Sequence, residues 1–179
     1  MAKNTAVFGI YPSRIAVEAA ITALHSAGYR ATDLSILMSE NIGNKELVHE
    51  KNSKSPEGAA TGALSGAVLG GAIGWLAGIG ALAIPGVGPL IAAGPIMAVL
   101  AGLGAGGAIG GFTGALVGLG IPEHEAKRFE GRVRNGGILL SVHCDSSEWT
   151  SRAKKILEAT GAQDISSTAE SAADHPLMH

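Results

Sequence analysis

Three adjacent residues late in the chain have side chains that could do chemistry: His143, Cys144 and Asp145. A thiol beside an imidazole could act as a nucleophile, and the three side chains together could ligate a metal ion. They end an apolar run that predicts a strand, and consecutive residues of a strand point to opposite faces of its sheet. We therefore expect His143 and Cys144 to diverge, leaving a buried thiol and an aspartate that caps the next helix.

The other candidates for chemistry are weaker. His124 lies between two glutamates in a predicted first helical turn, a pattern typical of solvated surface. His175 and His179 lie in a terminal segment that is expected to fray. Paired glycines occur, but without the Gly-Lys-Ser/Thr sequence of a phosphate-binding loop. The sequence thus predicts a protein that is not an enzyme, with no catalytic residue, no cofactor and no metal.

The elements that carry these residues repeat the order strand, helix, strand. A strand over 5–11, a helix opened by Pro12 and Ser13 and closed by Gly28, and a strand over 33–38 form the first copy. Residues 137–143, 146–160 and 163–167 form the second. Apolar residues recur at helical spacing in both helices: Val17, Ala20, Ile21 and Leu24 in the first, and Trp149, Ala153, Ile156 and Leu157 in the second. Two such halves with right-handed crossovers predict an α+β fold, a ferredoxin-like four-stranded sheet with two helices on one face.

An extra amphipathic helix is predicted between Pro122 and Gly136, with Ala126, Phe129 and Val133 on one side. Its basic residues are expected to form a solvated face, and contact with anionic lipid headgroups is the alternative. These residues are Lys127, Arg128, Arg132 and Arg134.

A long uncharged block interrupts the two halves. The chain has 27 glycines, and residues 58–122 hold most of them without a single Asp, Glu, Lys or Arg. The whole chain has 13 basic and 15 acidic residues, a net charge of −2, which argues against a nucleic-acid partner. The predicted parts are 1–57 (first half and polar linker), 58–121 (uncharged block), 122–168 (connecting helix and second half) and 169–179 (flexible tail).

The glycines of the block form two rows at a spacing of four. The candidate packing positions are Gly62, Gly66, Gly70, Gly74, Gly78, Gly102, Gly106, Gly110, Gly114 and Gly118. Because residues four apart are neighbours on a helix, each row predicts a groove that allows close helix packing. Prolines between the rows break the helix, so we expect a glycine-zipper hairpin with helices over about 58–84 and 96–120.

Three settings would bury this hairpin: a bilayer, the dry core of a soluble homo-oligomeric shell or filament, or the chain's own fold. Each helix is long enough to cross a membrane, and basic residues flank the block on both sides, which places both of its ends in the cytoplasm. The leading expectation is self-association at or in the cytoplasmic membrane. A large cytoplasmic assembly is the alternative.

Three segments resemble the general stress protein family of YflT type: AVFGIYPSRIAVEAAITALHSAGY, GIPEHEAKRFEGRVRNGGILLSVHC and the later GAQDIS. The resemblance spans residues 6–167. It implies a stress-associated bacterial protein, cytoplasmic or peripheral to the membrane, with a ferredoxin-like core and no catalytic residues to carry over. A further alternative is an accessory subunit of a membrane redox complex, because related small domains can occur beside such complexes.

Overall fold

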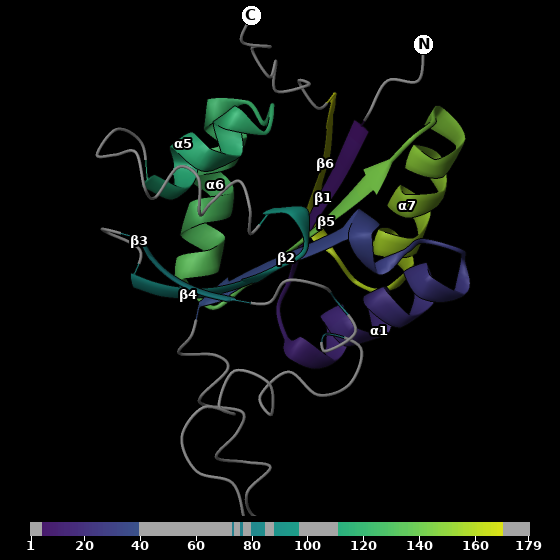
Figure 1. The fold of residues 1–179 in the computed structure, drawn as a ribbon, viewed down its shortest axis with the longest axis horizontal. Helices are drawn as coiled ribbons and strands as arrows, with labels where there is room; N and C mark the ends of the chain where they lie inside the picture. The colour runs from purple at the N-terminus through teal and green to yellow at the C-terminus, as the bar shows by residue number, and fades with distance from the viewer. Residues whose placement is uncertain are drawn as a thin grey trace, which may run out of the picture.

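The computed structural model describes residues 5–39, 73, 76, 80–84, 88–96 and 111–169, and these form an α+β fold (Figure 1). Its elements are, in chain order, β1 (Thr5–Tyr11), α1 (Arg14–Ser26), the short 3-10 helix η1 (Ala31–Asp33), β2 (Leu34–Ser39), β3 (Gly80–Ile84), β4 (Gly88–Ala93), α5 (Gly111–Gly118), α6 (Glu123–Arg134), β5 (Ile138–Cys144), α7 (Ser147–Ala159) and β6 (Gln163–Ala169).

One antiparallel sheet organises these elements, with strand order β3-β4-β2-β5-β1-β6. The four strands predicted from the sequence are all present and adjacent, as β2, β5, β1 and β6. The prediction of a four-stranded sheet is nevertheless wrong, because β4 and β3 extend the sheet beyond β2. The outer edge of β2 offers backbone donors and acceptors, and β4 satisfies them, for example where Ile36 pairs with Ala93.

The extension also corrects the predicted helical hairpin. Residues 80–84 and 88–93 form a β-hairpin, where the sequence predicted the end of one helix and the turn that follows it. The periodicity of such short apolar runs does not distinguish a buried strand from a buried helix. Here the segment forms a strand because it pairs with the free edge of β2. Part of the second predicted helix is present as α5. Residues 58–79 and 97–110 lie outside the described residues, apart from the single positions 73 and 76.

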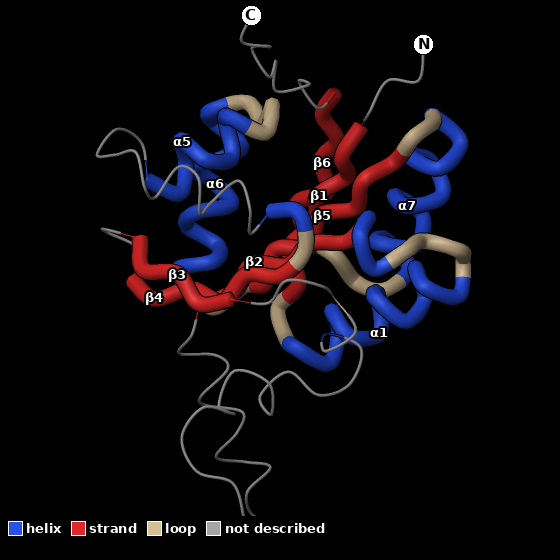
Figure 2. The backbone as a smooth tube through the Cα atoms, viewed as in Figure 1, coloured by secondary structure: helices blue, strands red, loops and turns tan. Residues whose placement is uncertain are grey.

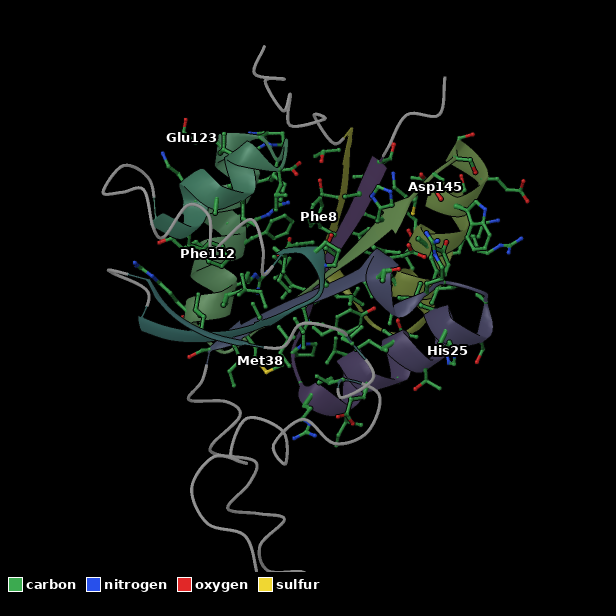
Figure 3. The ribbon with its side chains drawn as sticks, in the orientation of Figure 1. Phe8, His25, Met38, Phe112, Glu123 and Asp145 are labelled. Atoms are coloured by element: carbon green, nitrogen blue, oxygen red, sulfur yellow. The ribbon has the colours of Figure 1, made fainter. Side chains whose placement is uncertain are left out.

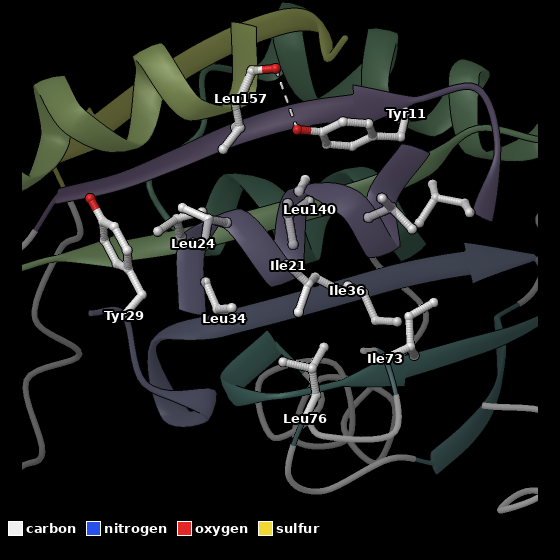
Figure 4. Close-up of a cluster of buried hydrophobic side chains, with 14 of the residues drawn as sticks. Tyr11, Ile21, Leu24, Tyr29, Leu34, Ile36, Ile73, Leu76, Leu140 and Leu157 are labelled. Carbon is white, nitrogen blue, oxygen red and sulfur yellow. Dashed lines mark hydrogen bonds between the residues drawn. The ribbon is translucent and has the colours of Figure 1, made fainter. Parts of the chain in front are cut away.

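Helices α1 and α7 cover one face of the sheet (Figures 1 and 2). All four residues of the predicted apolar face of α1 are buried, and on α7 Ala153 and Leu157 are buried while Trp149 and Ile156 are partly buried. Tyr11 is fully buried beneath α7, and its hydroxyl lies 2.8 Å from Thr160 Oγ1 and 3.4 Å from the carbonyl oxygen of Leu157 (Figure 4). This cluster is the core of the two repeated halves.

Helices α5 and α6 cover the opposite face (Figure 2). The residues predicted for the apolar side of α6 (Ala126, Phe129 and Val133) are all buried, as expected. Phe129 packs against Phe8 of β1 with ring centroids 6.3 Å apart. The described part of the molecule therefore has three layers, with the sheet between two pairs of helices.

The residue that caps the start of each helix agrees with the sequence prediction for α1 but not for α7. Ser13 caps α1, and its hydroxyl accepts a hydrogen bond from the backbone N–H of Ala16. The predicted cap of α7 was Asp145, but the cap is Ser146, which accepts from the N–H of Trp149. The Asp145 carboxylate instead lies 3.2 Å from Nε2 of His143.

Candidate functional site

The predicted glycine packing surface is described only at its end. Gly114 and Gly118 lie in α5, and the other eight positions lie outside the described residues. Helix α5 buries Phe112, Ala115 and Leu116 against the sheet and α6, whereas Gly118 is exposed and Gly114 is half-buried. Val117, beside the glycines on the same side, is 42% exposed. The glycine row and the core-facing side of α5 are therefore different faces of the helix.

The basic residues for which lipid contact was the alternative all lie on α6 near carboxylates. Two of them pair within the helix at a spacing of four: Lys127 Nζ lies 2.7 Å from Glu123, and Arg134 lies 3.1 Å from Glu130. Such exposed pairs contribute little to stability, but they offset the charge that a lipid headgroup would meet.

The other two basic residues, Arg128 and Arg132, reach across to Asp164 of β6 at 3.6 and 3.0 Å. Asp164 has a φ of 52° and lies where the register between β1 and β6 shifts, so a bulge presents its carboxylate to α6. Its Oδ2 and Arg132 Nε lack hydrogen-bond alignment, so their attraction is one between charges. All four basic residues of α6 considered for lipid contact thus have an acidic neighbour.

At the end of β5 the side chains of His143 and Cys144 diverge, as predicted. Cys144 faces α1 and α7 and is 1% exposed. Burial raises the pKa of its thiol to about 11, although hydrogen bonds with Thr150 and Tyr29 act to lower that pKa. His143 projects from the opposite face, where it lines a pocket. Figure 3 places Asp145 beside the start of α7. The imidazole and the thiol therefore do not share a site.

Other predicted ligand positions give no cluster in the described residues. The His124 side chain is 79% exposed and lies 3.9 Å from Glu125. No group of three or more His, Cys, Asp or Glu side chains in the described part of the chain could hold a metal ion. His175 and His179 lie outside that part.

Sequence reasoning missed a pocket of about 420 Å³ on the α5 and α6 side of the sheet. Its floor is a row across three strands, since Ser35 of β2 is paired with Ser141 of β5, which is paired with Phe8 of β1. Figure 3 shows Phe8 and Phe112 on this side of the sheet. The signal in the sequence was a serine inside each of two apolar runs, LSILM and ILLSV.

Three segments form the walls of this pocket: Pro95 and Ile96 after β4, Leu119 after α5, and the stretch from Arg30 to Asp33 before β2. Ser35 is 4% exposed, and its hydroxyl accepts a hydrogen bond from the N–H of Ile96 at 3.2 Å. That bond fixes the wall after β4 to the floor.

The charged residues of the pocket are paired with each other. Arg30 holds Asp33 through two side-chain hydrogen bonds of 2.8 and 3.0 Å and a backbone one of 2.9 Å. Burial acts to raise the pKa of Asp33, but the hydrogen bonds and charge of Arg30 outweigh it and leave the pKa below its ordinary value. Tyr29 anchors this segment, because its hydroxyl donates to the carbonyl oxygen of Trp149 at 2.6 Å.

None of the helices in the described ranges is both long and apolar enough to cross a bilayer. The glycine positions and the pocket are the two candidate sites in the described part of the chain, one on a helix face and one in the layer between sheet and helices. Searches of family models, curated proteins and solved structures found no match to this chain.

Proposed function

We propose that this chain is a non-enzymatic, stress-associated protein in which a ferredoxin-like domain self-associates through the glycine rows of its uncharged block. The ferredoxin-like part of the proposal is supported by the adjacency of β2, β5, β1 and β6 and by the packing of α1 and α7 on one face. Strands β4 and β3 are then additions to that core, contributed by the block. The stress association rests on the resemblance of the three segments named above.

The observation that best supports self-association is that the two sides of α5 differ. One side packs into the core through Phe112, Ala115 and Leu116. The other side presents Gly114, Val117 and Gly118, with no charged residue anywhere in α5. Glycine costs about 1 kcal/mol relative to alanine in a helix interior. Close approach of a second backbone is a physical reason to retain two glycines on this side.

A second copy of the chain is the partner that we propose for this face. Two identical helices that cross at their glycines form a self-complementary contact, in which each Gly114 approaches the partner's copy of the same face. Rows at a spacing of four favour crossing angles near −50° in water or near −40° in a membrane. The contact needs no charge complementarity, which suits a block that has no charged side chain.

The test is to replace both glycines of α5 with leucine and to measure the native mass by light scattering coupled to size exclusion. We expect the Gly114→Leu, Gly118→Leu variant to have a lower mass than the wild type. Gly131→Leu is the matched control, because Gly131 lies in α6, where an added Cβ meets no atom within 4 Å. Circular dichroism of each variant checks that the fold is kept.

Two results would contradict the proposal: a wild-type chain that is monomeric at all concentrations, or a double variant whose mass equals that of the wild type. Flotation with vesicles of neutral and anionic lipid then separates the two settings. Assembly without vesicle binding favours the soluble shell or filament, and assembly that floats with vesicles favours the membrane.

A further inference from the structure

We propose that the pocket over Ser35 and Ser141 binds a small, uncharged, flat heteroaromatic molecule that has hydrogen-bonding groups on its edge. This pocket lies between β1, β2 and β5 on one side and the segments after β4 and α5 on the other. The inference is separate from self-association, because none of the residues it uses belongs to the exposed face of α5.

The pocket exists because side-chain size changes abruptly between two neighbouring rows of the sheet. One row is made of Leu37, Leu139 and Ile10, which are paired across the three strands and are all buried among α5 and α6. In the next row both leucine positions become serine. Two short side chains opposite each other leave space that packed leucines would fill, and about 420 Å³ is within the range of small-molecule pockets.

The remaining surfaces of the pocket suit a flat ring. Phe8 lies on its floor, and Ile96 and Leu119 lie on its walls, so apolar groups surround the space from more than one direction. Polar side chains lie among these apolar groups, with Ser141 on the floor and Thr32 on a wall. A molecule with apolar faces and polar edges would contact both kinds of surface at once.

Charge selects against an ionic ligand. The guanidinium of Arg30 and the carboxylate of Asp33 neutralise each other through their hydrogen bonds. The His143 ring also has a carboxylate neighbour, since its Nε2 lies 3.2 Å from Asp145 Oδ1. An anion would meet the Asp33 carboxylate beside the guanidinium, and a cation would meet the guanidinium itself, so burial in this pocket costs a neutral ligand the least free energy.

Three probes of nearly equal shape test this prediction of charge: nicotinamide, which is neutral, nicotinate, which is an anion, and 1-methylnicotinamide, which is a cation. Titrations of the full chain by NMR or calorimetry would measure each dissociation constant. We expect nicotinamide to bind with a dissociation constant of about 1 mM or below, the range for a fragment of this size. Both ions should bind at least tenfold more weakly.

Variants then locate the binding. Ser141→Leu should abolish nicotinamide binding, because leucine restores the side-chain size of the neighbouring row. Ser141→Ala should weaken binding about fivefold, the loss of one hydrogen bond, and it keeps the experiment decisive if the leucine variant does not fold. Ser151→Leu, on the exposed side of α7, is the matched control and should bind as the wild type does.

The proposal is overturned if nicotinamide does not bind at millimolar concentration, if nicotinate or the cation binds as well as it does, or if both Ser141 variants bind like the wild type. The self-association variants Gly114→Leu and Gly118→Leu should leave nicotinamide binding unchanged. Failure of one proposal is therefore distinguishable from failure of the other.

Discussion

Replacement of Gly94 by alanine tests whether the uncharged block docks on the sheet. Gly94 follows β4 with a φ of +83°, and an added Cβ would lie 2.0 Å from the carbonyl oxygen of Leu34 and 2.9 Å from the Cα of Ser35. Both are backbone atoms of the neighbouring strand region, so a rotamer change cannot relieve the clash. The substitution must move the chain after β4 away from β2.

Two terms set the magnitude. A non-glycine residue in the left-handed region costs roughly 1–2 kcal/mol, and overpacking a well-packed site costs about 1–3 kcal/mol more. We expect Gly94→Ala to lower the free energy of unfolding by roughly 2–5 kcal/mol. Gly161→Ala is the matched control, because Gly161 has a φ of +88° and an added Cβ there meets nothing within 4 Å. It should lose only the first term.

The assay is urea denaturation followed by circular dichroism and by tryptophan fluorescence, with both variants and the wild type measured side by side. The difference between the two variants isolates the clash with β2. If Gly94→Ala costs no more than Gly161→Ala, then residues 88–96 do not pack against β2 in solution, and both the six-stranded sheet and the pocket wall are wrong.

Three further predictions concern other parts of the molecule. Burial raises the pKa of Cys144 from 9.0 to about 11, so the thiol stays protonated to a higher pH in the folded state than in the unfolded chain. Its contribution to stability should be complete below pH 9 and fall as the pH rises toward 11, as urea titrations with a Cys144→Ala comparison can measure. Gly131→Ala should stabilise the protein by about 0.5–1 kcal/mol, because the site in α6 is open and alanine is the better helix former. A fall in the thermal midpoint would contradict this. Asp164→Asn should increase sedimentation with anionic vesicles, because it releases Arg128 and Arg132 from their shared carboxylate, and unchanged sedimentation would remove α6 from consideration as a lipid contact.

The strands and helices of the two halves could be predicted from local patterns. Strands β1, β2 and β5 are short apolar runs bounded by turn residues, whereas the more polar β6 was predicted from the repeated order of strand, helix and strand. The buried faces of α1 and α6 follow from helical spacing. These patterns were sufficient because each helix buries one side, and because β1 and β2 are buried on both faces of the sheet, as continuous apolar runs indicate. The cap of α7 was misassigned by one residue, because Asp145 and Ser146 are adjacent and both residue types are good caps.

The uncharged block could not be assigned in the same way. Residues 80–93 consist mainly of Gly, Ala, Leu, Ile and Pro, which give neither a two-residue nor a helical period. Their strand structure depends on the edge of β2, a tertiary partner far away in sequence. The pocket was hidden for a similar reason, because Ser35 and Ser141 become neighbours only through the register of β2 with β5.

The sheet order has a consequence for how the chain is made. Strand β2 pairs on one side with β4 and on the other with β5, and about a hundred residues separate β2 from β5. At a synthesis rate of roughly 5–20 residues per second, β2 waits roughly 5–20 seconds on the ribosome before its last partner is made. During that time the pairs that Leu34, Ile36 and Leu37 make with β5 cannot form. Among the described strands only β3 and β4 pair across a short turn, so nearly all the sheet must form after translation of the chain is well advanced.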